Sequence, residues 1–178
     1  MKFKIIFSFL LVLFSSCFGN PIERRGTVYG YEKGIIKTMG GRFAIGILPS
    51  PWKEQRIRER AVLFENLNDH STITISSWCK GAIDDVSQEI LSQNLVRALT
   101  DTNILEKKEV PLGGRKAVMT RFTGELDHAL VYLKTYVLKM NQCVFDFYYV
   151  GFPHHHDSEK DFDQMVQGFV YLKGPEVL

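Results

Sequence analysis

The stretch "LVYLKTYVLKMNQCVFDFYYVGF" (residues 130–152) decides the fold. Two runs rich in β-branched and aromatic residues flank an Asn-Gln dipeptide, which predicts two antiparallel strands joined by a tight turn. Pairing across this turn sets Leu138 opposite Phe145 and Tyr136 opposite Phe147. Because apolar cross-strand pairs stabilise a sheet, we predict a β-hairpin with this register.

Aromatic side chains stand on both faces of the predicted hairpin. They are Tyr132, Tyr136, Phe145, Phe147, Tyr148, Tyr149 and Phe152. We favour the interpretation that the sheet is covered by a helix on each side, because large rings contribute most when they are buried. The alternative is an exposed aromatic groove that binds a lipid, a peptide or a partner subunit.

Alternating apolar and polar residues predict further strands on either side of this hairpin. They cover residues 43–47, 61–64, 72–79, 104–110 and 116–122. The first of them ends at Pro49 and Pro51, and we expect Trp52, which follows, to pack over the core.

Two amphipathic helices complete the pattern. The first follows a capping box formed by Asp85 and Gln88 and carries its apolar residues along one face. These are Val86, Ile90, Leu91, Leu95, Val96 and Leu99. The second begins near Ser158 as the N-cap. Its buried face consists of Phe162, Met165, Val166 and Phe169.

The order of the predicted elements is strands, helix, strands, helix. It indicates an antiparallel sheet flanked by helices and therefore an α+β fold. A chain of 178 residues with 45% hydrophobic and 24% charged residues is typical of one globular domain.

The net charge argues against nucleic acid as a partner. The chain has 22 basic and 20 acidic residues, and the loss of Lys2 and Lys4 with a leader would leave 20 of each. Binding to nucleic acid requires a basic surface that displaces counterions, which a neutral protein lacks.

The first sixteen residues are typical of a secretory signal peptide. A positively charged start is followed by about ten apolar residues and then by a polar pair. Since about 20 apolar residues are needed to cross a bilayer, this run is too short to be a membrane span.

Cys17 directly follows this leader. The sequence Phe14-Ser15-Ser16-Cys17 resembles the bacterial lipobox, in which small residues precede a cysteine that is diacylated and becomes the first residue of the mature protein. The match departs from the usual pattern at Phe14, where Leu is common. The interpretation is a lipoprotein whose palmitate-type chains anchor it to a membrane. The alternative is ordinary cleavage near Cys17 or Gly19.

Residues 17–40 are rich in glycine and charge and show no sustained period. This composition predicts a flexible tether between the anchor and a single domain over residues 41–178. An additional edge strand around residues 26–36 is the alternative.

Three segments of the chain carry a resemblance to a known group of proteins. They are "RFAIGILPSPW" (42–52), "PLGGRKA" (111–117) and "FDQMVQGFVYL" (162–172). Together with the middle helix, they resemble the PsbP-like superfamily over residues 41–172. That group includes extrinsic photosystem proteins and small bacterial lipoproteins. The resemblance implies an α/β/α sandwich with a binding or assembly role, and it supplies no catalytic residues.

A histidine run near the second helix is the strongest candidate for a metal site. Its residues are His154, His155 and His156, with Asp157, Glu159 and Asp161 close by. Imidazole and carboxylate together suit zinc, nickel or copper. Three consecutive histidines in a loop cannot all point at one ion, however, so we favour a solvated loop and expect no cofactor.

Cys79 and Cys143 are the remaining cysteines. In an exported protein two cysteines often form a disulfide, which we slightly favour here. Each lies at the end of a predicted strand on its apolar face, so two buried free thiols are nearly as consistent with the sequence.

The chain lacks the HExxH, nucleophile-elbow, P-loop and dinucleotide-binding motifs. We therefore expect a bacterial envelope lipoprotein, facing the periplasm, that binds a protein partner or assists assembly without catalysis. A carrier of a small apolar ligand or lipid is the main alternative, followed by a metal-dependent envelope enzyme. Without acylation of Cys17, the protein would be periplasmic or secreted.

Overall fold

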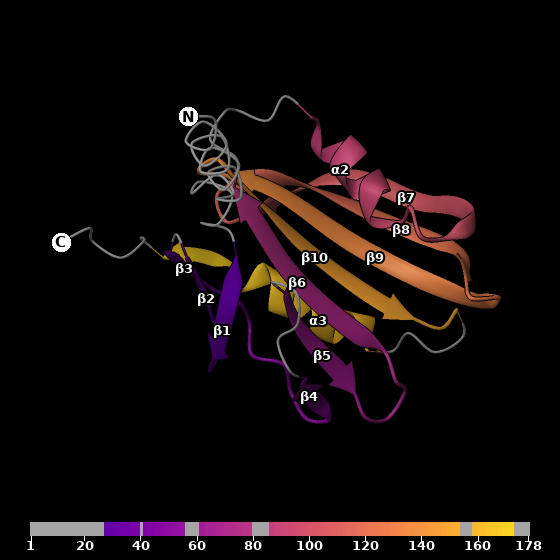
Figure 1. The fold of residues 1–178 in the computed structure, drawn as a ribbon, viewed down its shortest axis with the longest axis horizontal. Helices are drawn as coiled ribbons and strands as arrows, with labels where there is room; N and C mark the ends of the chain where they lie inside the picture. Colours follow the sequence, from indigo (N-terminus) through magenta and orange to yellow (C-terminus); the bar gives the residue numbers. More distant parts are fainter. Residues whose placement is uncertain (1–26, 40, 56–60, 80–85, 154–157, 173–178) are drawn as a thin grey trace, which may run out of the picture.

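The computed structural model describes residues 27–39, 41–55, 61–79, 86–153 and 158–172. All structural statements concern these ranges. Within them lie two antiparallel sheets and two helices (Figure 1). None of the helices in these ranges is long and apolar enough to cross a membrane.

The larger sheet has seven strands in the order β4-β5-β6-β10-β9-β8-β7, each antiparallel to its neighbours. Their bounds are β4 (Trp52–Glu54), β5 (Ala61–Asn66), β6 (Thr72–Cys79), β7 (Thr100–Leu112), β8 (Arg115–Leu126), β9 (Ala129–Met140) and β10 (Cys143–Gly151). The sequence predicts most of these strands, and those after the first helix are longer in the structure than predicted.

The hairpin formed by β9 and β10 lies at the centre of this sheet. Its predicted register is confirmed, since Leu138 pairs with Phe145 and Tyr136 with Phe147. The two turn residues, Asn141 and Gln142, have φ values of 53° and 62°. Two consecutive positive φ angles are typical of the type I′ turn that joins closely paired strands.

The smaller sheet has the order β1-β2-β3-β11. Its strands are β1 (Val28–Glu32), β2 (Ile35–Thr38), β3 (Gly41–Ala44) and β11 (Val170–Leu172). The prediction of a tether over residues 17–40 is therefore wrong for residues 28–38. Val28 and Ile36 are buried in the core, so the domain begins before residue 41. The prediction for residues 17–26 falls outside the described residues.

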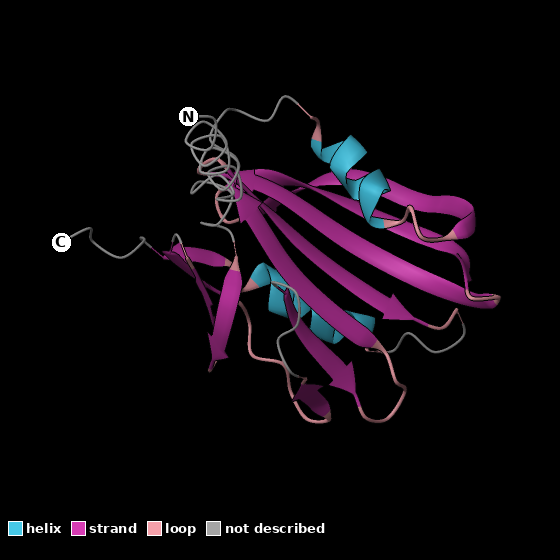
Figure 2. Ribbon diagram, in the orientation of Figure 1, coloured by secondary structure: helices cyan, strands magenta, loops and turns pink. Residues whose placement is uncertain are grey.

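The two helices, α2 (Gln88–Leu95) and α3 (Glu159–Gln167), lie on opposite faces of the seven-stranded sheet (Figure 2). On β9, Tyr136 packs against Phe162 of α3, and its neighbour Val137 shares a cluster with Leu91 of α2. Neighbouring residues of a strand point to opposite faces. The predicted α+β class, with an antiparallel sheet between helices, is confirmed, and the four-stranded sheet adds to it.

The main core lies between α3, the four-stranded sheet and the larger sheet. All four residues predicted for the buried face of the last helix are buried here. Five of the seven aromatic residues of the hairpin are also buried: Tyr132, Tyr136, Phe145, Phe147 and Tyr149. They belong to the core, as favoured from the sequence, whereas Phe152 is exposed.

The N-cap of the first helix lies two residues later than the sequence suggests. Its N-cap is Ser87, whose Oγ accepts a hydrogen bond from the Ile90 amide at 3.3 Å. Asp85, the predicted cap, lies outside the described residues. The side chain of Ile90 is 51% exposed, so the predicted apolar face is only partly buried.

The last helix ends at Gly168, and β11 follows it. The sequence places Phe169 on the buried face of this helix; Phe169 is buried, but it follows the helix. At Gly168 the chain passes so close to Gly46 that a residue with a Cβ does not fit. A Cβ there would lie only 2.7 Å from the Cα of Gly46. The Gly46 amide donates to the Met165 carbonyl at 2.8 Å, which holds this crossing together.

The chain leaves β3 earlier than predicted. The strand ends at Ala44, and Ile47 is 74% exposed, because the following residues cross α3 rather than continue in the sheet. Trp52 then packs against the core as expected but is only half-buried. Its Nε1 donates to the Oδ2 of Asp161 at 3.0 Å.

Candidate functional site

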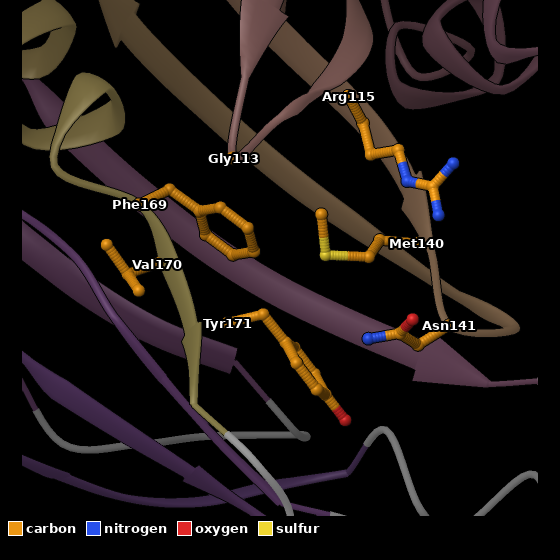
Figure 3. Close-up of a pocket in the computed structure, with 7 residues that line it drawn as sticks. All are labelled: Gly113, Arg115, Met140, Asn141, Phe169, Val170 and Tyr171. Atoms are coloured by element: carbon orange, nitrogen blue, oxygen red, sulfur yellow. The ribbon is translucent and has the colours of Figure 1, made fainter.

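An open pocket lies where two hairpin turns of the larger sheet meet β11 (Figure 3). Its volume is ≈ 430 Å³. We call it the Phe169 pocket; its lining residues are Gly113, Arg115, Met140, Asn141, Phe169, Val170 and Tyr171. Gly113 belongs to the turn between β7 and β8, and Arg115 is the first residue of β8. The end of β9 and its turn supply the next two residues, and the chain after α3 supplies the rest.

Glycine is required at one position of this pocket. Gly113 has a φ of +56°, and a Cβ there would lie 2.7 Å from Cδ1 of the Phe169 ring. The β7–β8 turn can therefore close directly over this ring only without a side chain. Asn141, with its φ of 53°, belongs to a residue type that tolerates the left-handed conformation.

The inner wall of the pocket is apolar and firmly held. Phe169 is only 2% exposed, and its ring centroid lies 5.2 Å from that of Phe145 and 5.7 Å from that of Phe147. Figure 3 shows the side chains of Phe169 and Met140 pointing toward one another. Ring contacts of this kind keep the wall in one arrangement.

The rim of the pocket is polar. The guanidinium of Arg115 and the side chain of Asn141 lie on the opposite side of the pocket from Val170 (Figure 3). Arg115 is exposed, and its side chain has neither an ion-pair nor a hydrogen-bond partner among the described residues. The pocket thus joins an apolar wall to a cation that no described residue compensates.

A second depression, of ≈ 780 Å³, shares Arg115 and follows the end of the β7–β8 hairpin. Its other lining residues are Glu109, Val110, Pro111, Gly114 and Lys116. The Lys116 ammonium pairs with Glu109 at 2.7 Å. Arg115 is therefore the one lining residue of this depression whose charge has no partner among the described residues.

A cluster of buried charges connects the larger sheet to α3. We call it the Glu159 cluster; its members are Arg121, Tyr132, Lys134, Tyr136, Glu159 and Asp163. Lys134 is 2% exposed, and its Nζ lies 2.6 Å from Oε1 of Glu159 and 2.7 Å from the carboxylate of Asp163. A lysine this deeply buried is stable only with such partners.

Hydrogen bonds fix the remaining groups of the cluster. Tyr132 donates to Glu159 at 2.9 Å, and Tyr136 donates to Asp163 at 2.9 Å. Arg121 donates to Glu159 at 2.8 Å and to Glu106 at 2.9 Å. Every carboxylate named here therefore has a cationic partner.

The electrostatics of the cluster favour fixed charges. Burial alone would raise the pKa of Glu159, but hydrogen bonds from Lys134 and Tyr132 outweigh it and hold the pKa below its usual value. Burial, together with the nearby carboxylates, raises the pKa of Tyr132 and of Tyr136. Neither the carboxyl group nor the phenols can exchange a proton readily near neutral pH, so the cluster is suited to holding α3 in place.

A pocket of ≈ 520 Å³ adjoins this cluster. Its lining residues are Leu105, Glu106, Arg121, Thr123, Tyr132, Pro153 and Glu159. The cation of this pocket, Arg121, is already bonded to two carboxylates, so the pocket offers no uncompensated positive charge.

Asp146 is the buried carboxyl group of the opposite, α2-facing side of the sheet. It is 6% exposed, and burial raises its pKa to about 7, while a hydrogen bond with Trp78 lowers it in part. A carboxyl group with this pKa changes its charge near neutral pH.

Two acidic residues near the predicted metal site, Glu159 and Asp161, have other partners in the structure. Glu159 belongs to the cluster described above, and Asp161 accepts a hydrogen bond from Trp52. The three histidines, His154, His155 and His156, lie outside the described residues, as do Asp157 and Cys17. Across the ranges that the structure does describe, no group of three or more His, Cys, Asp or Glu residues could hold a metal ion.

The structure brings Cys79 and Cys143 together. They are directly opposite one another on β6 and β10, with a Cα–Cα distance of 4.0 Å. A disulfide joins their sulfur atoms, with an S–S distance of 1.99 Å.

The sequence analysis missed the Glu159 cluster and the Phe169 pocket. One signal for the cluster was present: Lys134 alternates with Tyr132 and Tyr136 on the inward face of a strand, where a cation needs a buried partner. Its partners lie 25 and 29 residues away on another element, beyond the reach of local patterns. The pocket depends on β11, which continues the apolar spacing of the preceding helix.

Comparison with solved structures identifies the fold. The cyanobacterial PsbP (CyanoP) of Synechocystis sp. PCC 6803 has a TM-score of 0.55 and 12% identity, with 90% of this chain and 99% of that chain covered. A protein of Bacteroides thetaiotaomicron has a TM-score of 0.54 and 15% identity over 74% of this chain. Here the chain spans 45% of the other protein's length.

A third structure is less similar. It is LpqN, which is involved in cell envelope biogenesis of Mycobacterium tuberculosis, with a TM-score of 0.48 and 15% identity over 72% of this chain and 82% of that one. No protein-family model and no curated protein match this chain. The similarity to the cyanobacterial protein extends over nearly the full length of both chains, and this chain therefore has a PsbP-like fold.

Proposed function

We propose that this protein is a membrane-anchored, non-enzymatic domain of the bacterial cell envelope that binds a protein partner or assists assembly. Its anchor is the acylated Cys17, and the domain faces the periplasm. The PsbP-like fold agrees with this role without establishing it, since one fold can serve many functions.

The observation that supports binding over catalysis is the contrast between paired and unpaired charges. In the Glu159 cluster each buried carboxylate is bonded to a cation, and no nucleophile lies beside a base among its members. Arg115, whose charge has no partner among the described residues, stands instead at the rim of an open pocket with an apolar wall. Such a surface recognises a ligand and offers no proton-transfer group.

The anchor rests on the sequence. A leader with a positively charged start is followed by Ser15-Ser16-Cys17, and acylation with two or more chains gives stable attachment to a membrane.

Replacement of Cys17 tests the anchor. In Cys17→Ala we expect loss of labelling by a fatty-acid analogue and release of the protein from the membrane fraction. Ser16→Ala is the matched control, because it keeps the cysteine and a small residue before it, and it should be labelled like the parent. Labelling of Cys17→Ala at the parent's level would contradict the anchor.

Cross-linking in intact cells, followed by affinity purification and mass spectrometry, tests the binding role. We expect the full-length protein to recover a partner in a constant ratio. The control is Phe162→Ala, which removes a ring from the centre of the core and should lose a partner that recognises the folded surface. Equal recovery of the same proteins by both variants, or no partner in either sample, would contradict the proposal.

A further inference from the structure

The Phe169 pocket has the dimensions of a small-molecule site. Its volume of ≈ 430 Å³ lies within the range of about 300 to 1,000 Å³ that is usual for ligand pockets. Such sites are lined mostly by apolar side chains, with a few polar groups that orient the ligand. Phe169, Met140 and Tyr171 supply the apolar lining here, and Arg115 and Asn141 supply the polar groups.

The polar groups select an anion. The guanidinium of Arg115 has five N–H donors in a planar fork that matches a carboxylate, and none of them is engaged by a described residue. The side-chain amide of Asn141 adds two further donors on the same side of the pocket (Figure 3). None of the described residues that line the pocket is acidic, so none of them competes for these donors.

The apolar lining selects a ligand with a hydrocarbon part. Phe169 is held by the rings of Phe145 and Phe147 and by its contact with Gly113, so this wall exists before a ligand arrives. A preformed wall lowers the free-energy cost of ordering the site upon binding. Val170, which is exposed, extends the apolar surface at the other side.

The pocket beside the Glu159 cluster also contains an arginine but does not share these properties. Arg121 is bonded to Glu106 and Glu159, and both carboxylates line that pocket. An anion entering there would meet two fixed negative charges. The depression that shares Arg115 has the carboxylate of Glu109 in its lining, so an anion meets less competition in the Phe169 pocket.

We propose that the Phe169 pocket binds a small amphipathic carboxylate, with its carboxylate on Arg115 and Asn141 and its hydrocarbon part against Met140, Val170 and Tyr171, which the buried ring of Phe169 supports from behind. This inference uses the same pocket that supports the binding role above, but it does not require a protein partner, because a small ligand can bind the purified chain alone. Its test therefore uses the purified full-length chain without any partner.

The experiment is a titration of the isotope-labelled full-length protein with decanoate below its micelle concentration, followed by amide NMR shifts. We expect saturable shifts concentrated at Gly113, Arg115, Asn141, Val170 and Tyr171. Decanol has the same chain without the charge and should bind at least about fivefold more weakly, since it cannot form charge-assisted bonds.

Two substitutions at the rim separate the pocket from non-specific binding. Arg115→Gln removes the cation and should weaken decanoate binding about fivefold to tenfold, and Asn141→Asp places a negative charge beside the ligand and should weaken it at least as much. Arg97→Gln is the matched control, because Arg97 is also exposed and lacks an ion-pair partner among the described residues. It should bind decanoate like the parent.

Three results would overturn the inference. They are shifts spread over the surface without saturation, equal affinity for decanoate in Arg115→Gln and the parent, and equal affinity of the parent for decanol. Saturable shifts at the same residues with an acidic peptide, in the absence of any with decanoate, would also reject a small carboxylate as the ligand and assign the pocket to a protein segment.

Discussion

The two faces of the seven-stranded sheet are covered in different ways. On one face, α3 and the four-stranded sheet enclose a continuous cluster of buried side chains in which the rings of Phe43, Phe145 and Phe169 touch. On the other face, α2 covers β8 and β9, and the described residues there form two small clusters, around Phe122 and Val137. The first face therefore contributes most of the packing that holds the domain together.

The faces also differ in how they treat buried charge. The α3 face buries Lys134 and Glu159, and the partly exposed Asp163 is a second partner of Lys134. The α2 face buries Asp146, whose pKa is raised by burial, with Trp78 as a hydrogen-bond partner. The comparison teaches that bonds to a cation lower the pKa of a buried carboxyl group, whereas burial without a cationic partner among the described residues raises it.

The largest difference should appear when one apolar side chain is removed from each helix. Phe162→Ala on α3 should lower the free energy of unfolding by about 3 to 5 kcal/mol, because the ring is fully buried. Leu91→Ala on α2, at the edge of a small cluster, should cost about 2 kcal/mol, near the lower end for such substitutions. Urea unfolding measures both, and an equal loss would contradict the unequal roles of the two faces.

For Asp146, on the α2 face, we predict that the free energy of unfolding depends on pH. Its pKa is about 7 in the folded protein against 3.8 for the free side chain, so the unfolded state loses its proton first as the pH rises. The contribution of the Asp146 carboxyl group to the free energy of unfolding is therefore fully present below about pH 4 and is lost between about pH 4 and 7. Asp146→Asn should remove this loss and stabilise the protein at pH 8 by up to about 4 kcal/mol, at 1.36 kcal/mol for each pKa unit.

The measurement is urea unfolding of Asp146→Asn and its parent at several pH values from 4 to 8. The two stabilities should converge at the acid end and separate as the pH rises. A constant difference across this range would show that Asp146 keeps an ordinary pKa in the folded protein.

For Glu159, on the α3 face, we predict a pH dependence of the stability with the opposite sign. Its pKa is lowered in the folded protein, so its contribution is present above the ordinary carboxyl pKa and is lost as the pH falls through the folded value. Glu159→Gln should lower the free energy of unfolding by about 2 kcal/mol at pH 7. The loss is smaller than for a buried lysine left without any anionic partner, because Lys134 still pairs with Asp163.

Thermal melting at pH 7 and at pH 3 checks this prediction. The difference between Glu159→Gln and the parent should shrink at the lower pH, where the parent's carboxylate begins to protonate. An undiminished difference would indicate a packing effect in place of the loss of charge.

The serines that precede the two helices should give the smallest effects. Ser158 is the N-cap of α3, but its Oγ donates to Asp69 at 2.7 Å and lies 3.0 Å from the Tyr149 hydroxyl. Ser158→Ala should cost about 2 kcal/mol, because buried polar groups lose a partner. Ser87→Ala should cost about 1 kcal/mol, the usual value for an exposed N-cap. Thermal melting of both variants measures the difference, and a larger loss in Ser87→Ala would reverse the order.

Much of the larger sheet and the buried face of α3 could be predicted from the sequence. The β9–β10 register follows from alternation around a two-residue turn, and Phe162, Met165 and Val166 follow from helical spacing. These features depend on residues that are near one another in the chain. Local periodicity therefore carries the information that determines them.

The smaller sheet could not be predicted in the same way. β1 and β2 are short and contain glycine and charged residues, and they are stable only because Val28 and Ile36 reach the core. β11 pairs with β3 across more than 120 residues of sequence, and Gly168 was the single local sign that the helix ends before it. The Phe169 pocket arises from this long-range pairing, which explains why the sequence did not reveal it.

Native-state hydrogen exchange of the full-length protein tests the unequal roles of the two faces most directly. We predict that amides of α2, such as that of Leu91, exchange through a local opening. The free energy of this opening should be at least about 2 kcal/mol below that of global unfolding. Amides of α3, such as Phe162, and of β9 and β10 should exchange only at the free energy of global unfolding. Equal protection of α2 and α3, or earlier opening of α3, would contradict the claim that the α3 face holds the domain together.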